Sequence, residues 1–357
     1  MSSGTPTSSA SPSESSYDRT RMRQWARGRA RSAGIDRRDL LKLVAAASAA
    51  APLIPAAASP AHAAQSLAGV VKPLPPELFT VRGTNAETNF SALRDTGLLT
   101  PADRFFVRNH TATPVVDATD WTLTVWGDGL AGGPVDFSYE ALRALPAVSR
   151  TAFVECAGNG RSFFTSQQGQ QVGGTAWTLG AIGTARWRGV RLAEVLRRAG
   201  IANIKWVGDI EVSAEPLLSP WNTGLYRLFG PGYPAEGSAP LARQTLKSAF
   251  ELAPGASFAA HRRHLLTGRS WSGGAPVRSV EVSTDGGTRW RPARLRDESR
   301  PGSWVRWSSD WVPRETGPGV LLARATDRSG RSQPATTAHN TQGYLFDAVV
   351  RHPVTVV

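Results

Sequence analysis

Short alternations of apolar and polar residues dominate the last third of the chain. Val277–Ser283 alternates like a strand, the Asp-Gly-Gly run at residues 285–287 predicts a turn, and Trp290 resumes a strand. We expect further strands at Val320–Ala325 and Val349–Val357. Short strands separated by turns over roughly 115 residues favour an immunoglobulin-like β-sandwich.

The middle of the chain mixes expected strands with expected short helices. Trp121–Trp126 alternates like a strand, Thr151–Cys156 reads as a buried strand that ends in a loop, and Lys205–Val212 is another strand. Tyr139–Leu145 and Arg191–Ala199 have the pattern of short helices. This mixture predicts an α+β domain before the sandwich.

A glycine pattern follows the first of these strands. Residues 127–132 read GDGLAG and match GxGxxG, but a dinucleotide site needs a helix to open directly after the glycines. Gly133 and Pro134 follow instead and block such a helix. We therefore predict a hairpin or loop here rather than a dinucleotide-binding turn.

The N-terminal region has the pattern of an export signal. Residues 1–34 are rich in Ser, Ala and Arg without apolar periodicity, which predicts disorder. Arg37 and Arg38 precede an uncharged, Ala-rich stretch from Leu43 to Val71, and residues 61–63 match an A-x-A cleavage site. This order predicts a twin-arginine signal, and hence export by the twin-arginine translocase to the periplasm or beyond. The alternative is a basic linker followed by an Ala-rich helix.

Composition and charge change this picture little. Hydrophobic residues make up 41% of the 357 residues, with 12 Trp and 12 Phe, so the chain can bury a core. The net charge is +13, but residues 1–63 hold nine of the 41 basic and four of the 28 acidic residues, which leaves +8 for the rest. No recognition-helix or RNA-binding motif accompanies the excess, so we do not expect nucleic acid as a partner.

Cys156 is the single cysteine of the sequence. That count excludes an intramolecular disulfide, a CxxC zinc site and a CxxCH haem site. Cys156 lies in the segment Glu155–Arg161, whose small residues let backbone N–H groups approach a ligand closely. A thiolate here could act as a nucleophile or a metal ligand, and the alternative is an inert buried cysteine.

A series of motifs resembles the sulfite oxidase family of molybdenum-cofactor enzymes. The matching runs are FFVRNH at 105–110, ECAGN at 155–159, GTAW at 174–177, ARWRGV at 185–190, IKW at 204–206, SPWNTGLY at 219–226, GRSWSG at 268–273 and EVSTDGG at 281–287. Together they extend over most of residues 75–357. Their combination and order are specific, although each piece alone is not.

The resemblance implies a role for several side chains. Cys156 is expected to ligate molybdenum beside the pterin dithiolene, and Arg108 and Arg161 are expected to bind the anionic substrate. Tyr226 corresponds to an active-site tyrosine and Trp177 to a wall of the substrate pocket. Arg161 as a surface charge, and Tyr226 and Trp177 as core aromatics, are the alternatives. The expected contacts of the molybdenum–molybdopterin cofactor are Asn109, His110, Cys156, Ala157, Gly158, Asn159 and Lys205.

The resemblance also implies a fold, a reaction and partners. We expect a molybdopterin domain with mixed sheets and short helices over residues 64–238, after the N-terminal region 1–63. An immunoglobulin-like domain that forms a homodimer would span residues 239–357. The expected reaction is oxygen-atom transfer to sulfite or a related sulfur oxyanion. Because the chain has no haem site, electrons would pass to an external acceptor such as a c-type cytochrome.

The resemblance breaks between Gly200 and Lys205. Relatives have several dozen residues there, including a substrate-facing aspartate and a His-Gly-x-Pro-x-Arg segment that holds the pterin phosphate. This sequence joins the flanking segments directly. The omission predicts weaker cofactor retention, and it leaves a non-catalytic secreted binding protein as the alternative function.

Overall fold

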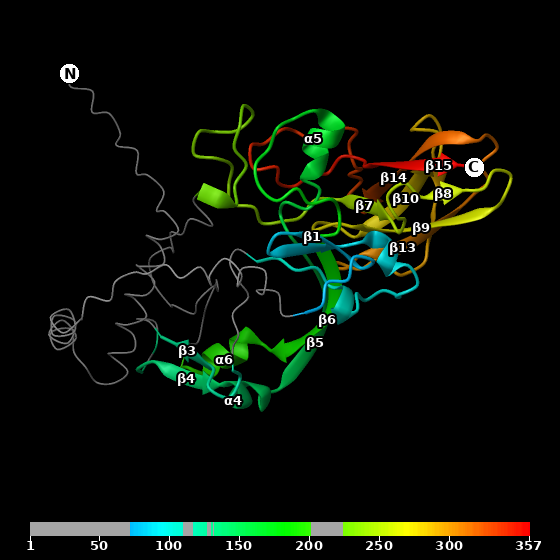
Figure 1. Ribbon diagram of the computed structural model, residues 1–357. Coiled ribbons are helices and arrows are strands. Elements are labelled where there is room, and N and C mark those ends of the chain that lie inside the picture. Colours follow the sequence, from blue (N-terminus) through cyan, green and yellow to red (C-terminus); the bar gives the residue numbers. More distant parts are fainter. Residues whose placement is uncertain (1–71, 110–116, 127–129, 131, 201–223) are drawn as a thin grey trace, which may run out of the picture. The chain divides into compact units, whose positions relative to one another are not determined.

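The structure is a computed structural model that describes residues 72–109, 117–126, 130, 132–200 and 224–357 (Figure 1). These residues form two compact units. The first holds the described residues of 115–149 and 188–225, and the second holds those of 60–114, 150–187 and 226–357. The predicted domain boundary at 238/239 lies inside the second unit.

The first unit contains a β-hairpin and two helices. Strands β3 (Thr122–Val125) and β4 (Val135–Ser138) pair antiparallel, which confirms the predicted hairpin. Helices α4 (Tyr139–Arg143) and α6 (Leu192–Arg198) confirm both predicted helices. Their apolar side chains share one core, whose buried members are Val125, Phe137, Leu145, Val195, Leu196 and Ala199.

Strands β5 (Ala147–Glu155) and β6 (Ile182–Val190) pair in a two-stranded sheet and carry residues of both units. The sequence predicted a buried strand that ends at Cys156. The strand is present, but its burial was predicted wrongly: every residue of β5 is exposed or half-buried. The reason is that β6 is its single pairing partner among the described strands, so no larger sheet encloses it.

The second unit contains the predicted β-sandwich. One sheet has the order β11-β10-β14-β15-β8 and the other β12-β13-β9-β7. The strands are β7 (Lys247–Phe250), β8 (Ser257–Phe258), β9 (His264–Trp271), β10 (Val277–Ser283), β11 (Arg291–Pro292), β12 (Arg294–Leu295), β13 (Val305–Trp311), β14 (Gly317–Asp327) and β15 (Arg351–Val356). All pairings are antiparallel except β15 with β8.

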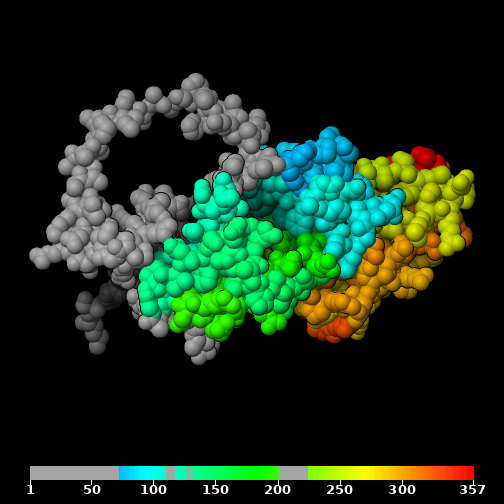
Figure 2. Space-filling view, turned by 90° about the horizontal axis from the view of Figure 1, so that it is seen from below, coloured from blue at the N-terminus to red at the C-terminus, as the bar shows by residue number. Residues whose placement is uncertain are grey.

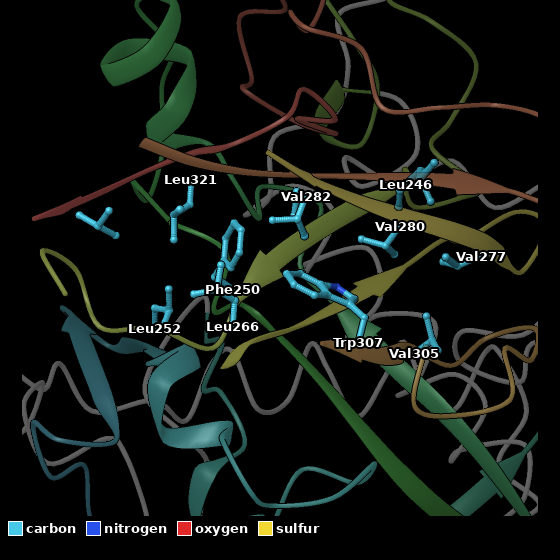
Figure 3. Close-up of a cluster of buried hydrophobic side chains, with 13 residues drawn as sticks. Leu246, Phe250, Leu252, Leu266, Val277, Val280, Val282, Val305, Trp307 and Leu321 are labelled. Carbon is cyan, nitrogen blue, oxygen red and sulfur yellow. The ribbon is translucent and has the colours of Figure 1, made fainter. Parts of the chain in front are cut away.

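Alternate residues of these strands meet in the sandwich core. Figure 3 shows side chains of both sheets turned toward one another, with Trp307 of β13 near its centre. Trp307 is fully buried, and its ring meets that of Phe250 edge-on at 5.1 Å between centroids. Its indole N–H donates to Ser270 Oγ at 2.9 Å, so the polar atom of this large side chain is satisfied.

The N-terminal part of the second unit packs on the sandwich. Its elements are β1 (Phe79–Arg82), β2 (Asn85–Thr88), the 3-10 helices η1 (Phe90–Leu93) and η2 (Ala102–Arg104), and α5 (Ser162–Gln168). Phe90 stacks on Trp271 at 6.0 Å and contacts Trp304 edge-on at 6.4 Å. Figure 2 shows the blue and cyan segment that holds β1, β2 and η1 against the yellow and orange strands of the sandwich. The Cys156 segment therefore belongs to the same compact unit as the sandwich.

Several sequence predictions lie outside the described residues. They are the twin-arginine signal, the strand at Lys205–Val212 and the shortened connection after Gly200. Among the described residues, no helix combines the length and apolar character needed to cross a bilayer.

Candidate active site

Cys156 lies where β5 ends and a tight loop begins. Its N–H donates to the Ala181 carbonyl at 3.0 Å, and its own carbonyl accepts from the Asn159 N–H at 2.9 Å. The Ala157 carbonyl accepts from the N–H of Leu345 at 2.9 Å. Hydrogen bonds from three parts of the chain thus fix the backbone on both sides of the cysteine.

Asn159 braces this loop from inside. It is fully buried, its amide group donates to Glu155 Oε1 at 2.9 Å, and its Oδ1 accepts from the Ala181 N–H at 3.0 Å. Both ends of the side chain are therefore used within the protein. Asn159 therefore stabilises the cysteine loop through its contacts with Glu155 and Ala181.

A cavity of about 660 Å³ opens in front of Cys156. Cys156, Arg108 and Tyr226, which the sequence singled out, all line it. Its other lining residues are Phe106, Val154, Glu155, Ala157, Leu241, Ala242, Arg243, Gln244 and Leu345. The volume suits a small-molecule or cofactor site, and segments distant in sequence supply its walls.

Arg161 is a buried cation next to this cavity. It is 7% exposed, its Nε donates to the Gln342 carbonyl at 2.9 Å, and its Nη1 donates to the Thr175 carbonyl at 2.8 Å. Neutral carbonyls do not cancel its charge, and within the described part of the chain it forms no ion pair with a carboxylate. Burial lowers the pKa of Arg161, and the neighbouring Cys156 and Tyr344 oppose that shift.

Three glycines make room for this arginine. A Cβ at Gly158 would lie 2.5 Å from Arg161 Nη2, and one at Gly174 would lie 2.9 Å from Nη1. A Cβ at Gly343 would lie 2.7 Å from Arg161 Cγ. All three distances are below normal van der Waals contact, so larger residues at these positions would displace the guanidinium.

Two tyrosines and Arg108 complete the polar side of the site. The rings of Tyr226 and Tyr344 stack at 5.7 Å, and the Arg161 guanidinium lies 5.2 Å from the Tyr344 ring centroid. Burial raises the pKa of Tyr226, against the opposing effect of Arg108. Burial likewise raises the pKa of Tyr344. Both hydroxyls therefore stay protonated at neutral pH and can donate hydrogen bonds.

The structure separates the other predicted site residues. Trp177 is fully buried and is not among the cavity-lining residues. Asn109 donates to the residues where β2 begins: its N–H donates to Asn85 Oδ1 at 2.8 Å and its side-chain amide to the Thr84 carbonyl at 3.2 Å. His110 and Lys205 lie outside the described residues.

Sequence reasoning missed Arg243, Gln244 and Tyr344. Arg243 and Gln244 line the cavity, and Tyr344 stacks on Tyr226. No local pattern marks these three positions, since each lies in a segment without regular secondary structure. Arg243 nevertheless adds a further positive charge to the cavity, which Arg108 also lines.

The side chains at the cavity fit a metal ion that a cofactor supplies with most of its ligands. Among the described residues no group of three His, Cys, Asp or Glu side chains could hold a metal ion. Cys156 nevertheless offers a thiol, a soft metal ligand, at the wall of the cavity. Arginines and tyrosine hydroxyls beside that thiol suit the anionic groups of a cofactor or substrate.

Comparison with protein families gives two matches. Residues 110–209 match the oxidoreductase molybdopterin binding domain, and residues 255–356 match the Mo-co oxidoreductase dimerisation domain. The first match contains Cys156, and the second covers most of the sandwich. These comparisons give no support to a non-catalytic binding protein.

Individual relatives agree with these matches. Mitochondrial sulfite oxidase of Mus musculus is 27% identical, covering 77% of this chain and 65% of that protein. Sulfite oxidase of Gallus gallus is 28% identical, over 70% of this chain and 72% of that protein. Nitrate reductase [NAD(P)H] of Hordeum vulgare is 41% identical over 118 residues, or 13% of its length. The chain thus spans slightly less than two-thirds of the mouse protein.

A solved structure shares the fold. The sulfane dehydrogenase SoxCD from Paracoccus pantotrophus superposes with a TM-score of 0.61 at 21% identity, covering 84% of this chain and 92% of that one. The likeness supports the predicted architecture of mixed sheets and short helices together with a sandwich.

Proposed function

Because the chain belongs to the sulfite oxidase family of molybdopterin-dependent oxidoreductases, we propose that it oxidises sulfite or a related sulfur oxyanion. For sulfite the product is sulfate: water supplies the added oxygen, and two protons and two electrons leave. The observation that carries the proposal is one cavity that joins the Cys156 thiol to the positive charge of Arg108, with the buried Arg161 beside it.

The residues at the cavity fit the family's cofactor. Cys156 would ligate the metal, and Arg108 and Arg161 offer charge-assisted hydrogen bonds. When bound, the molybdenum cofactor supplies a two-electron oxidation coupled to oxygen-atom transfer. The fixed backbone around Cys156 lowers the conformational cost of placing the thiol when the cofactor binds.

The protein's own groups would bind and orient the substrate. A sulfur oxyanion presents several acceptor oxygens, and an arginine donates to two of them in parallel. Arg108 lines the cavity and suits this task, while the buried Arg161 beside it adds a positive charge that no carboxylate neutralises in the described chain. The protonated Tyr226 hydroxyl can donate a further hydrogen bond to the same anion.

The choice of sulfite is supported by the names of the relatives. Two of them are sulfite oxidases, matched over 70% or more of this chain, whereas the nitrate reductase match covers 33% of it. We infer that sulfite is the first substrate to test. Nitrate is the second compound to test, for comparison.

The wider setting is also part of the proposal. We propose that the enzyme is exported by the twin-arginine translocase, works as a homodimer and passes its electrons to an external acceptor such as a c-type cytochrome. The paired Arg37 and Arg38 support export, and the dimerisation-domain match supports the homodimer. Replacement of both arginines by lysine should leave the precursor in the cytoplasm, and unchanged export would contradict that route.

The test is steady-state oxidation of sulfite by purified protein with a one-electron acceptor such as ferricyanide. We expect wild-type turnover and none for Cys156→Ser, because a hydroxyl replaces the soft thiolate. Arg108→Gln should raise KM, since a charge-assisted bond contributes about 1.5–3 kcal/mol. Molybdenum-loaded wild-type protein that leaves sulfite unoxidised would refute the proposal.

A further inference from the structure

Glu155, the residue immediately before Cys156, lies at the centre of a buried hydrogen-bond network. Its Oε1 accepts from Lys247 Nζ at 2.7 Å and from the Asn159 amide at 2.9 Å. Its Oε2 accepts from the indole N–H of Trp271 at 3.0 Å. Its main-chain carbonyl accepts from the Gln244 amide at 3.1 Å. The carboxylate thus ties the cysteine loop to strands β7 and β9.

The ion pair in this network is enclosed. The side chain of Glu155 is 0% exposed and that of Lys247 is 2% exposed. Lys247 also acts on a second carboxyl group, because its charge opposes the effect of burial on the pKa of Asp347. Loss of the Lys247 charge would leave Glu155 as an unpaired buried anion next to the cysteine.

We propose that Glu155 and Lys247 are positioning residues that hold Cys156 in the geometry needed to ligate the molybdenum cofactor. The inference rests on the proposed function, since it takes Cys156 as the metal ligand. Lys247 does not line the cavity, so it acts through Glu155. Partners that orient a metal ligand in this way usually change metal affinity or activity about 10–100-fold when they are replaced.

A second buried ion pair provides a matched control. Arg269 and Glu251 pair at 2.7 Å, with their side chains 0% and 5% exposed. Arg269 also donates to the Leu93 carbonyl at 2.7 Å and lies over the Trp304 ring. Neither Arg269 nor Glu251 lines the cavity, and the side-chain hydrogen bonds of Arg269 go to Glu251, Leu93, Thr96 and Leu98 rather than to the cysteine loop. Breaking this pair should affect stability without acting on Cys156.

The experiment compares Lys247→Met, Glu155→Gln, the double variant and the control Glu251→Gln, all in the full chain. For each protein we measure the molybdenum content per chain and the melting temperature. Steady-state kinetics with sulfite give KM and kcat, with kcat expressed per molybdenum. We expect Lys247→Met to lower molybdenum content or kcat at least about tenfold with little change in KM. The double variant should keep most of that loss, because the ion pair that ties the cysteine loop to β7 is absent there too.

The control separates positioning from stability. Glu251→Gln should lower the melting temperature but keep molybdenum content and kcat near wild type. The proposal is overturned if Lys247→Met changes only the melting temperature, or if both pairs affect molybdenum content equally. If Lys247→Met does not fold, Glu155→Gln carries the same test, because it removes the charge while keeping the side-chain shape.

Failure of this inference differs from failure of the proposed function. Wild-type protein without molybdenum would overturn both. Wild-type protein that holds molybdenum but does not oxidise sulfite would overturn only the substrate assignment, and molybdenum content would still test the pair. A molybdenum-loaded, active Lys247→Met variant with normal kcat would overturn only the positioning role.

Discussion

At the scale of single residues, the decisive feature is a buried positive charge beside the cysteine. Arg161 bonds to the carbonyls of Gln342 and Thr175, which fix the guanidinium but leave its charge available. Burying a charge without a counter-ion is costly. An anion bound at the neighbouring cavity would lower that cost, so the arginine favours anionic ligands.

Arg161→Gln should therefore raise KM for sulfite. Loss of a charge-assisted hydrogen bond of about 1.5–3 kcal/mol corresponds to roughly a ten- to hundredfold change. Steady-state kinetics measure the effect, with Arg150→Gln as control because Arg150 is an exposed arginine of β5. Equal KM values for both variants and wild type would show that Arg161 does not bind the substrate.

Asp347 gives a pH-dependent prediction. Burial raises its pKa above 3.8, although its carboxylate accepts from Thr337 Oγ1 at 2.8 Å. A raised folded-state pKa means that stability is fully present below the unfolded value and is lost as pH rises through the folded value. Asp347→Asn should thus melt at a higher temperature than wild type at pH 7, with the difference shrinking toward pH 4. Thermal unfolding across this range measures it, and a difference that grows on acidification would contradict the sign.

At the scale of elements, β9 shows how tightly the sandwich is packed. A Cβ at Gly268 would lie 2.2 Å from the Trp307 ring and 2.4 Å from the Ala249 carbonyl oxygen. The strands on both sides of β9 thus approach too closely for any side chain at this position.

Gly268→Ala should destabilise the protein by about 1–3 kcal/mol, the usual effect of overpacking. The control is Gly189→Ala in β6, where the added Cβ meets nothing within 4 Å. Denaturant unfolding compares the two variants. Equal free energies of unfolding would mean that β13 and β7 relax around the new methyl group without strain.

Strands with clear alternation could be predicted from the sequence. β10 spans Val277–Ser283 as expected, and β14 and β15 contain most of the expected Val320–Ala325 and Val349–Val357. The hairpin of β1 and β2 was missed because its four-residue strands are too short to show a period. The burial of β5 was predicted wrongly because apolar content does not reveal how many strands will pair with it.

At the scale of the whole molecule, the cavity is built from segments that lie far apart in the sequence. Arg108, Cys156 and Tyr226 were predicted as a group from the motifs, and they line one cavity. Trp177 and Arg243 show the limit of this reasoning. A buried tryptophan and a pocket tryptophan have the same sequence pattern, and only tertiary contacts bring Arg243 to the cavity wall.

The dimerisation-domain match at residues 255–356 gives a prediction for the whole chain. We expect the purified protein to be a homodimer at micromolar concentration, because that family of domains is named for subunit association. Size-exclusion chromatography with light scattering measures the mass directly. A monomer mass throughout the micromolar range would contradict this expectation.

The central claim is that Cys156 ligates molybdenum in this protein. X-ray absorption at the molybdenum edge of wild-type protein and Cys156→Ser tests it most directly, because it counts sulfur ligands independently of turnover. The account predicts the dithiolene sulfurs and one further sulfur in wild type, and loss of that further sulfur in the variant. The same number of sulfur ligands in both proteins would contradict it.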